Sequence, residues 1–177
     1  WGASLLTLRS DGGNLLIQPR TASQSIGLGN SATGGLNLTA AELDGIQNGF
    51  ASITIGHAAG TGAVDVRSYA FKDNVTIRTP GSGGIINLNG ALSTGSGNLA
   101  GDITLLAGRN IVGNNGSSVI ASTGNIAMTA TGLGGTGDFH GIHLVGSAVV
   151  RTTGTGNILM TGTGGTTATY AGIRLAD

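Results

Sequence analysis

Short runs in which apolar residues alternate with small or polar residues recur along the whole chain. Their common template is Gly-x-apolar-x-apolar, whose two apolar positions share one face of a β-strand because strand side chains alternate between faces. Clear copies begin at Gly13, Gly34, Gly84, Gly101, Gly124 and Gly156, and weaker copies begin at Gln24, Ala51, Gly62 and Asp73. The pattern therefore predicts many short strands separated by glycine-rich bends.

The copies follow two related intervals. Starts at 13, 24 and 34, and again at 51, 62, 73 and 84, define a short interval of about 11 residues, a regular period of the kind found in repeat proteins. The segment GNIAMTATG at 124–132 returns as GNILMTGTG at 156–164, with seven of nine positions identical. We interpret this longer interval as three of the shorter ones, so that each coil of about 32 residues holds three short strands. The prediction is an all-β, right-handed parallel β-helix (a solenoid) of about five and a half coils, formed by residues 1–177 as a single domain.

Such a coil pairs its strands in parallel with equivalent strands about 4.8 Å above and below, so like residues stack on like. Four interior neighbours are predicted: Ile126 with Ile158, Met128 with Met160, Ile142 with Ile173, and Leu144 with Leu175. Asn125 over Asn157 predicts an amide ladder at a corner. Phe139 over Tyr170 predicts an aromatic pair near another bend, with a packing role.

Residues 39–50 interrupt the regular short spacing. Thr39 and Glu42 match a capping box, and Gly45 and Gly49 limit the helix to a turn or two. A short helical excursion near 39–49 is therefore expected at one coil corner, either as a binding loop or, the favoured interpretation, as an insertion that covers apolar surface. The covering side chains would be Leu43, Ile46 and Phe50.

Composition narrows the function classes. The chain has 35 Gly, 9% charged residues and no Cys, yet its aliphatic residues are regularly spaced, which a disordered chain does not require. Eight basic residues balance eight acidic ones without a cluster, so no nucleic-acid partner is expected. The sequence has no apolar run long enough to predict membrane insertion. Because the chain opens at Trp1 without Met, a processed product or an excised segment is expected.

No catalytic, cofactor or metal site is predicted. Carbohydrate-active β-helices need several charged groups on one outer face, whereas here only Glu42 and Asp44 are close in sequence, and Asp65 with Arg67 is expected to point outward. His140 and His143 are three positions apart, which on a strand predicts opposite faces and no shared metal ion.

Two glycine motifs are not interpreted as binding sites, and the first of them is interpreted as a corner. Residues 134–138 are similar to the calcium-binding nonapeptide repeat of β-rolls, but the acid comes one position early and the motif does not recur. Gly132, Gly134 and Gly137 have the spacing of a dinucleotide fingerprint without the helix that should follow it.

The amino-acid sequences of three segments resemble those of a known class of proteins. LTAAELDGIQNGFASITIGHAAGTGAVDV at 38–66, NVTIRTPGSGGIINLNGAL at 74–92 and GNILMTGTGG at 156–165 are similar to the repeat regions of filamentous-haemagglutinin-like, β-strand-repeat bacterial surface exoproteins. The resemblance implies secretion to the surface of a bacterium or beyond it, a β-helical shaft, and roles in adhesion or matrix building. It implies no catalytic residues.

The predicted function is therefore structural: an extracellular shaft or fibre subunit of a surface adhesin. Strand-like sequence begins at residues 4–8 and still runs at 173–175, and we expect no helical cap at either end. Open β-helix edges favour pairing with copies of the chain, head to tail, or with neighbouring coils of a longer parent chain. A cell-surface glycan or matrix is a further candidate partner.

Two alternatives remain open at this point: a carbohydrate-active enzyme and a glycan-binding or ice-binding module. Ice binding needs regular outward Thr pairs on one flat face. Thr129 and Thr131, repeated at Thr161 and Thr163, supply two rows that earlier coils do not continue.

Overall fold

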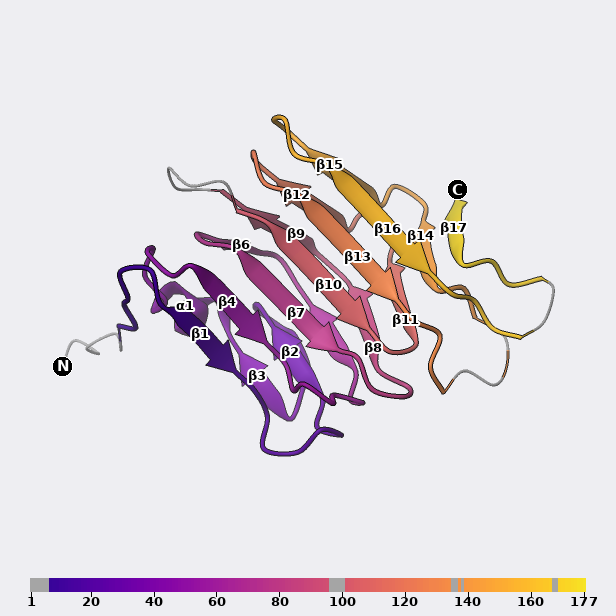
Figure 1. The fold of residues 1–177 in the computed structure, drawn as a ribbon, viewed down its shortest axis with the longest axis horizontal. Coiled ribbons are helices and arrows are strands. Elements are labelled where there is room, and N and C mark those ends of the chain that lie inside the picture. The colour runs from indigo at the N-terminus through magenta and orange to yellow at the C-terminus, as the bar shows by residue number, and fades with distance from the viewer. Residues whose placement is uncertain (1–6, 96–100, 135–136, 138, 167–168) are drawn as a thin grey trace.

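The structure, a computed structural model, describes residues 7–95, 101–134, 137, 139–166 and 169–177. Within these ranges the regular structure is almost entirely β, arranged as three parallel sheets (Figure 1). Sheet 1 contains, in spatial order, β1 (Asn14–Ile17), β4 (Ser52–Ile55), β7 (Val75–Thr79), β10 (Ile103–Ala107), β13 (Ile126–Ala130) and β16 (Ile158–Gly162).

Sheet 2 contains β17 (Ile173–Ala176), β14 (Ile142–Val145), β11 (Asn110–Gly113), β8 (Ile85–Leu88), β5 (Val64–Val66), β2 (Ile26–Leu28) and β3 (Leu36–Leu38). Sheet 3 contains β15 (Val149–Thr152), β12 (Ser118–Ala121), β9 (Ala91–Thr94) and β6 (Tyr69–Phe71). The prediction of an all-β, parallel architecture is confirmed.

The chain visits the three sheets in turn. After β7 it forms β8 in sheet 2 and β9 in sheet 3, and then returns to sheet 1 as β10, which pairs in parallel with β7. We call one such passage a circuit. Successive circuits add along the long axis of the molecule, from the indigo N-terminal strands to the yellow C-terminal ones (Figure 1). Parallel pairing of this kind joins residues of different circuits, so the sheets depend on long-range contacts.

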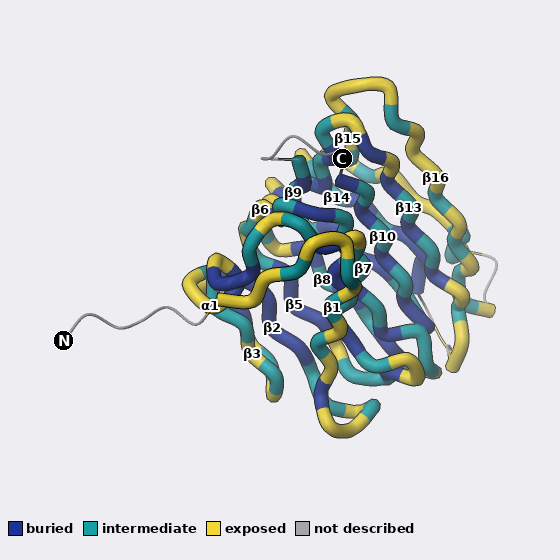
Figure 2. The backbone as a smooth tube through the Cα atoms, turned by 60° about the vertical axis from the view of Figure 1, so that its left-hand side comes forward, coloured by how far each residue is buried: buried dark blue, intermediate teal, exposed yellow. Residues whose placement is uncertain are grey.

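One interior lies between the sheets. In β10 the side chains of Ile103, Leu105 and Ala107 are buried, whereas Thr104 and Leu106 between them are half-buried on the outer face. The same alternation in the central strands of all three sheets builds a single aliphatic core. Buried residues of these strands are dark blue in Figure 2. Burial of each Leu or Ile stabilises the fold by about 1.5–3 kcal/mol.

The predicted circuit length of about 32 residues holds for the last circuit but not for all of them. In sheet 1, Ile53 pairs with Val75 of the next circuit, whereas Ile126 pairs with Ile158. Two of the short sequence intervals, and not three, therefore complete the shorter of these circuits. The strand that the spacing misses in this circuit is in sheet 3: β6 fits between β5 and β7, in the glycine-free stretch 63–80.

The 24-to-34 step is also misassigned, because β2 and β3 pair directly in sheet 2 instead of lying in consecutive sheets. The connecting residues 29–35 cross the outer face of β2. A Cβ at Gly34 would lie 2.2 Å from the backbone nitrogen of Gly27, so only a glycine allows this approach.

The predicted helical excursion is present as α1 (Ala40–Asp44). Thr39 Oγ1 accepts from the backbone N–H of Glu42 at 3.3 Å, and Glu42 Oε2 accepts from the N–H of Thr39 at 2.8 Å, which completes the capping box. The backbone hydrogen bond from Thr39, followed by that from its side chain, lowers the pKa of Glu42. The expected covering side chains are all buried: Leu43, Ile46 and Phe50.

A buried carboxylate fixes the corner after the helix. Asp73, 2% exposed, accepts hydrogen bonds from the N–H groups of Gly49 and Phe50 at 3.1–3.2 Å. Since α1 directly follows β3, the N-terminal edge strand of sheet 2, Leu43 of the helix packs into the core near this edge.

Candidate functional site

A column of polar residues runs along the corner that precedes sheet 1. Its members each lie one position before the first inward-facing residue of a strand: Asn14, Ser52, Asn74, Asp102, Asn125 and Asn157. The backbone N–H of Asn125 donates to Asp102 Oδ1 at 2.6 Å, and that of Asn157 donates to Asn125 Oδ1 at 2.9 Å. One circuit thus satisfies a backbone donor of the next. Asn157 Oδ1 receives no hydrogen bond from the described residues.

The four predicted aliphatic neighbours lie in register: Ile126 with Ile158, Met128 with Met160, Ile142 with Ile173, and Leu144 with Leu175. Exposure changes abruptly within these pairs. Ile126 is 1% exposed and Ile158 44%, while Leu144 is 8% exposed and Leu175 71%. Column positions that are buried in the preceding circuit are therefore exposed in the last one.

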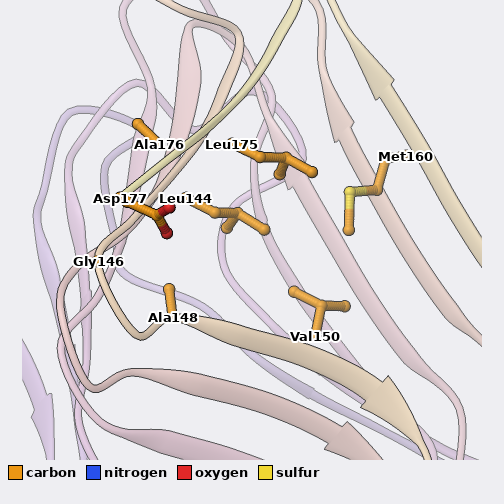
Figure 3. Close-up of a pocket in the computed structure, with 8 residues that line it drawn as sticks. All are labelled: Leu144, Gly146, Ala148, Val150, Met160, Leu175, Ala176 and Asp177. Carbon is orange, nitrogen blue, oxygen red and sulfur yellow. The ribbon is translucent and has the colours of Figure 1, made fainter.

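The C-terminal end of the interior is open. Its rim consists of β15, β16 and β17, each the outermost strand of its sheet in the described residues. A cavity of about 460 Å³ opens there, lined mainly by apolar side chains with one carboxylate at the rim (Figure 3). Lining residues include Leu144, Ala148, Val150, Met160, Leu175 and Asp177. We call this surface, the rim strands with the cavity, the open end.

Phe139 and Tyr170, the predicted aromatic pair, make other contacts. Phe139 is buried, with the guanidinium of Arg109 4.7 Å above its ring. Tyr170 instead packs against His140, with ring centroids 5.0 Å apart. Both rings serve packing at the corner before β14 and β17.

The prediction that His140 and His143 occupy opposite faces is wrong, because their ring centroids are 4.8 Å apart. His140 precedes β14, which begins at Ile142, so strand alternation does not extend to it. His140 Nδ1 accepts from the N–H of Ala171 at 3.0 Å. Burial, and then the charges of His140 and Arg174, lower the pKa of His143. No group of three or more potential metal-ligating residues occurs among the described residues.

Several acidic residues hold the fold together. Besides Glu42, Asp73 and Asp102, the buried Asp65 accepts hydrogen bonds from Asn89, Thr33 and Arg67 at 2.7–3.2 Å. Burial raises the pKa of Asp65, but these hydrogen bonds outweigh it, and the net pKa is lowered. Asp65 and Arg67, expected to point outward together, form an ion pair with an N···O distance of 3.2 Å.

The outward Thr rows are shorter than ice binding requires. Thr129 pairs with Thr161 on the outer face of sheet 1, but Leu106 and Arg78 occupy the same column in the two preceding circuits. A separate column, missed by the sequence pattern, joins Thr54, Thr76 and Thr104, and it ends at Ala127.

Two predictions fall on residues that the structure does not describe. The strand expected at 4–8 includes residues 4–6, and the glycine corner at 134–138 includes 135, 136 and 138, all outside the described ranges. In the described part of the chain, no helix is long and apolar enough to cross a membrane.

Comparisons of the chain with protein-family models, with curated proteins and with solved structures found no match.

Proposed function

We propose that this chain is a structural element of a bacterial surface adhesin or filament: a right-handed β-helical shaft whose open end, in the 177-residue chain, is covered by a further coil from a second copy. Each circuit is then one coil of the β-helix. A right-handed path is supported by the strong preference for that hand in parallel β crossovers. Location outside the cell rests on the resemblance of residues 38–66 and 74–92 to exoprotein repeats.

The observation that carries the proposal is the exposure of Leu175. Leu144, its neighbour in the same column, is buried beneath the last circuit, but the described residues place nothing over Leu175 itself. Apolar surface of this kind gains about 25 cal/mol per Å² when another coil removes it from water. The outer edges of β16 and β17, with which no described strand pairs, favour the same partner, a strand that adds to each edge.

The N-terminal end supplies matching edges. We propose that β1 of one copy pairs with β16 of the next, and β3 with β17, which continues sheets 1 and 2 across the junction. The inward-facing residues of β1 and β3 are only half-buried, so they have surface left to contribute: Leu15, Ile17, Leu36 and Leu38. Because the two ends differ, the contact is heterologous and propagates as a filament.

The hydrogen bonds that the aspartate side chains accept favour a structural role over an enzymatic one. Asp73 and Asp102 accept hydrogen bonds from backbone N–H groups, and Asp65 is held by polar neighbours from the loop, from the residue that follows β5 and from the adjoining circuit. Carboxylates engaged in this way stabilise corners and do not converge on a substrate.

Sedimentation velocity and negative-stain electron microscopy of the 177-residue chain test the proposal. The wild type should form filaments that lengthen with concentration. Leu175→Asp should remain monomeric, because stacking would bury an unpaired charge. Leu133→Asp is the matched control, since Leu133 is 53% exposed at a corner away from the open end. A wild type that stays monomeric at high concentration, or equal loss of filaments in both variants, overturns the proposal.

A further inference from the structure

A groove of about 410 Å³ lies on the outer face of sheet 2, far along the chain from the open end. In β5, Val64 and Val66 face the core, so Asp65 between them points outward to form the floor. The loop 29–35 crosses the outer face of β2 and makes one wall. The opposite side comes from β8 and the residues that follow it. Six polar residues line the groove: Ser25, Thr33, Asp65, Arg67, Asn87 and Asn89.

The floor of the groove is rigid and ionised. Asp65 is 9% exposed, and its carboxylate accepts from the N–H of Thr33 at 3.0 Å, from Asn89 Nδ2 at 2.7 Å and from Arg67 Nε at 3.2 Å. These bonds come from the loop, from the residue that follows β5 and from the next circuit. They fix the two walls of the groove relative to each other, so the groove is formed before any ligand arrives.

Other groups in the groove have unused hydrogen-bonding capacity. Arg67 uses Nε on Asp65, but its two terminal nitrogens bond none of the described residues, and its side chain is 39% exposed. The Asn87 side-chain amide also bonds none of them. Ser25 Oγ accepts from the N–H of Gly35 at 3.0 Å, which leaves its hydroxyl proton available. The groove thus offers several donors and one amide acceptor over a short distance.

We propose that this groove binds an uncharged saccharide unit. Asp65 and Arg67 neutralise each other, so the groove carries no net charge to select an ion. Adjacent hydroxyl groups of a sugar both donate and accept, which matches the Asn87 amide, the Arg67 terminal nitrogens and the Ser25 hydroxyl. The volume lies in the range of small-ligand pockets. This inference goes beyond the proposed shaft, because the groove is complete within one copy.

Binding is tested on the Leu175→Asp chain, which separates saccharide binding from filament formation. ¹H–¹⁵N NMR spectra are recorded during titration with maltose, cellobiose and lactose, and in parallel with glucuronate and glucosamine. At least one neutral disaccharide should shift the backbone amides of residues 33, 65–67 and 87–89. Asn87→Ala should weaken that binding about fivefold to tenfold, the loss of one neutral hydrogen bond. Arg67→Gln should weaken it similarly.

Thr104→Ala is the control, because Thr104 is an outward residue of sheet 1. Its dissociation constant should equal that of the parent chain. The proposal is overturned if no neutral disaccharide shifts these amides at saturating concentration, or if only glucuronate or glucosamine does. Equal affinity in the parent, Asn87→Ala and Arg67→Gln chains overturns it as well.

Discussion

Leu88, Leu144 and Leu175 occupy one interior column of sheet 2, and the same substitution in each should have graded effects. Leu88 is 1% exposed and lies between other circuits. Leu88→Ala loses the free energy gained by burying the leucine side chain and leaves a cavity, so it should lower the free energy of unfolding by about 3 kcal/mol. Leu175 is 71% exposed. Less than a third of its surface leaves water, and no closed cavity forms, so Leu175→Ala should cost about 0.5 kcal/mol in the monomer.

Urea unfolding followed by far-ultraviolet circular dichroism measures the difference, at a concentration where sedimentation shows a monomer. Leu144→Ala should lie between the two, because Leu144 has one covering circuit. The slope of the unfolding curve should be compared as well, since stacked repeats can lose cooperativity. An equal loss of unfolding free energy for Leu175→Ala and Leu88→Ala would refute the assignment of Leu175 to an uncovered end.

Two further predictions concern the backbone and pH. Gly56→Ala should destabilise the fold by about 2 kcal/mol more than Gly12→Ala in thermal unfolding. Both glycines have positive φ (+121° and +93°), but only a Cβ at Gly56 would collide with another residue, 1.9 Å from the Arg78 carbonyl oxygen. Equal changes in Tm for the two variants would contradict this prediction. The lowered pKa of His143 means that the folded chain binds fewer protons than the unfolded one, so stability should fall as pH drops below about 6.5. His143→Gln should reduce that loss in urea midpoints between pH 7.5 and 5, and an unchanged pH dependence would count against it.

Repetition in the sequence predicted the pairing of the last circuits well. GNIAMTATG and GNILMTGTG place identical residues one circuit apart, so the register of Met128 with Met160 follows from alignment alone. The capping box at Thr39 likewise predicted α1, because its hydrogen bonds are local and need no tertiary partner.

The rest depends on contacts between distant residues. The strand Tyr69–Phe71 has no glycine before it, and its pairing with β9 is decided by the neighbouring circuit. The groove arises because the loop 29–35 folds back over β2, which brings Thr33 to Asp65, 32 positions away. His140 and His143 meet because the chain is not extended before Ile142. Strand periodicity describes none of these arrangements.

The unequal circuits show how such a chain can evolve. The shorter circuit from Ile53 to Val75 and the longer one from Ile126 to Ile158 both keep their strands aligned, since most of the difference is absorbed at the corners. Duplication of one circuit adds strands whose edges already match those of their neighbours. Insertions at a bend can then change the surface while the core residues keep their places. The loop 29–35, which contacts Asp65 through Thr33, is one such bend, and it forms a groove on the outer face of sheet 2.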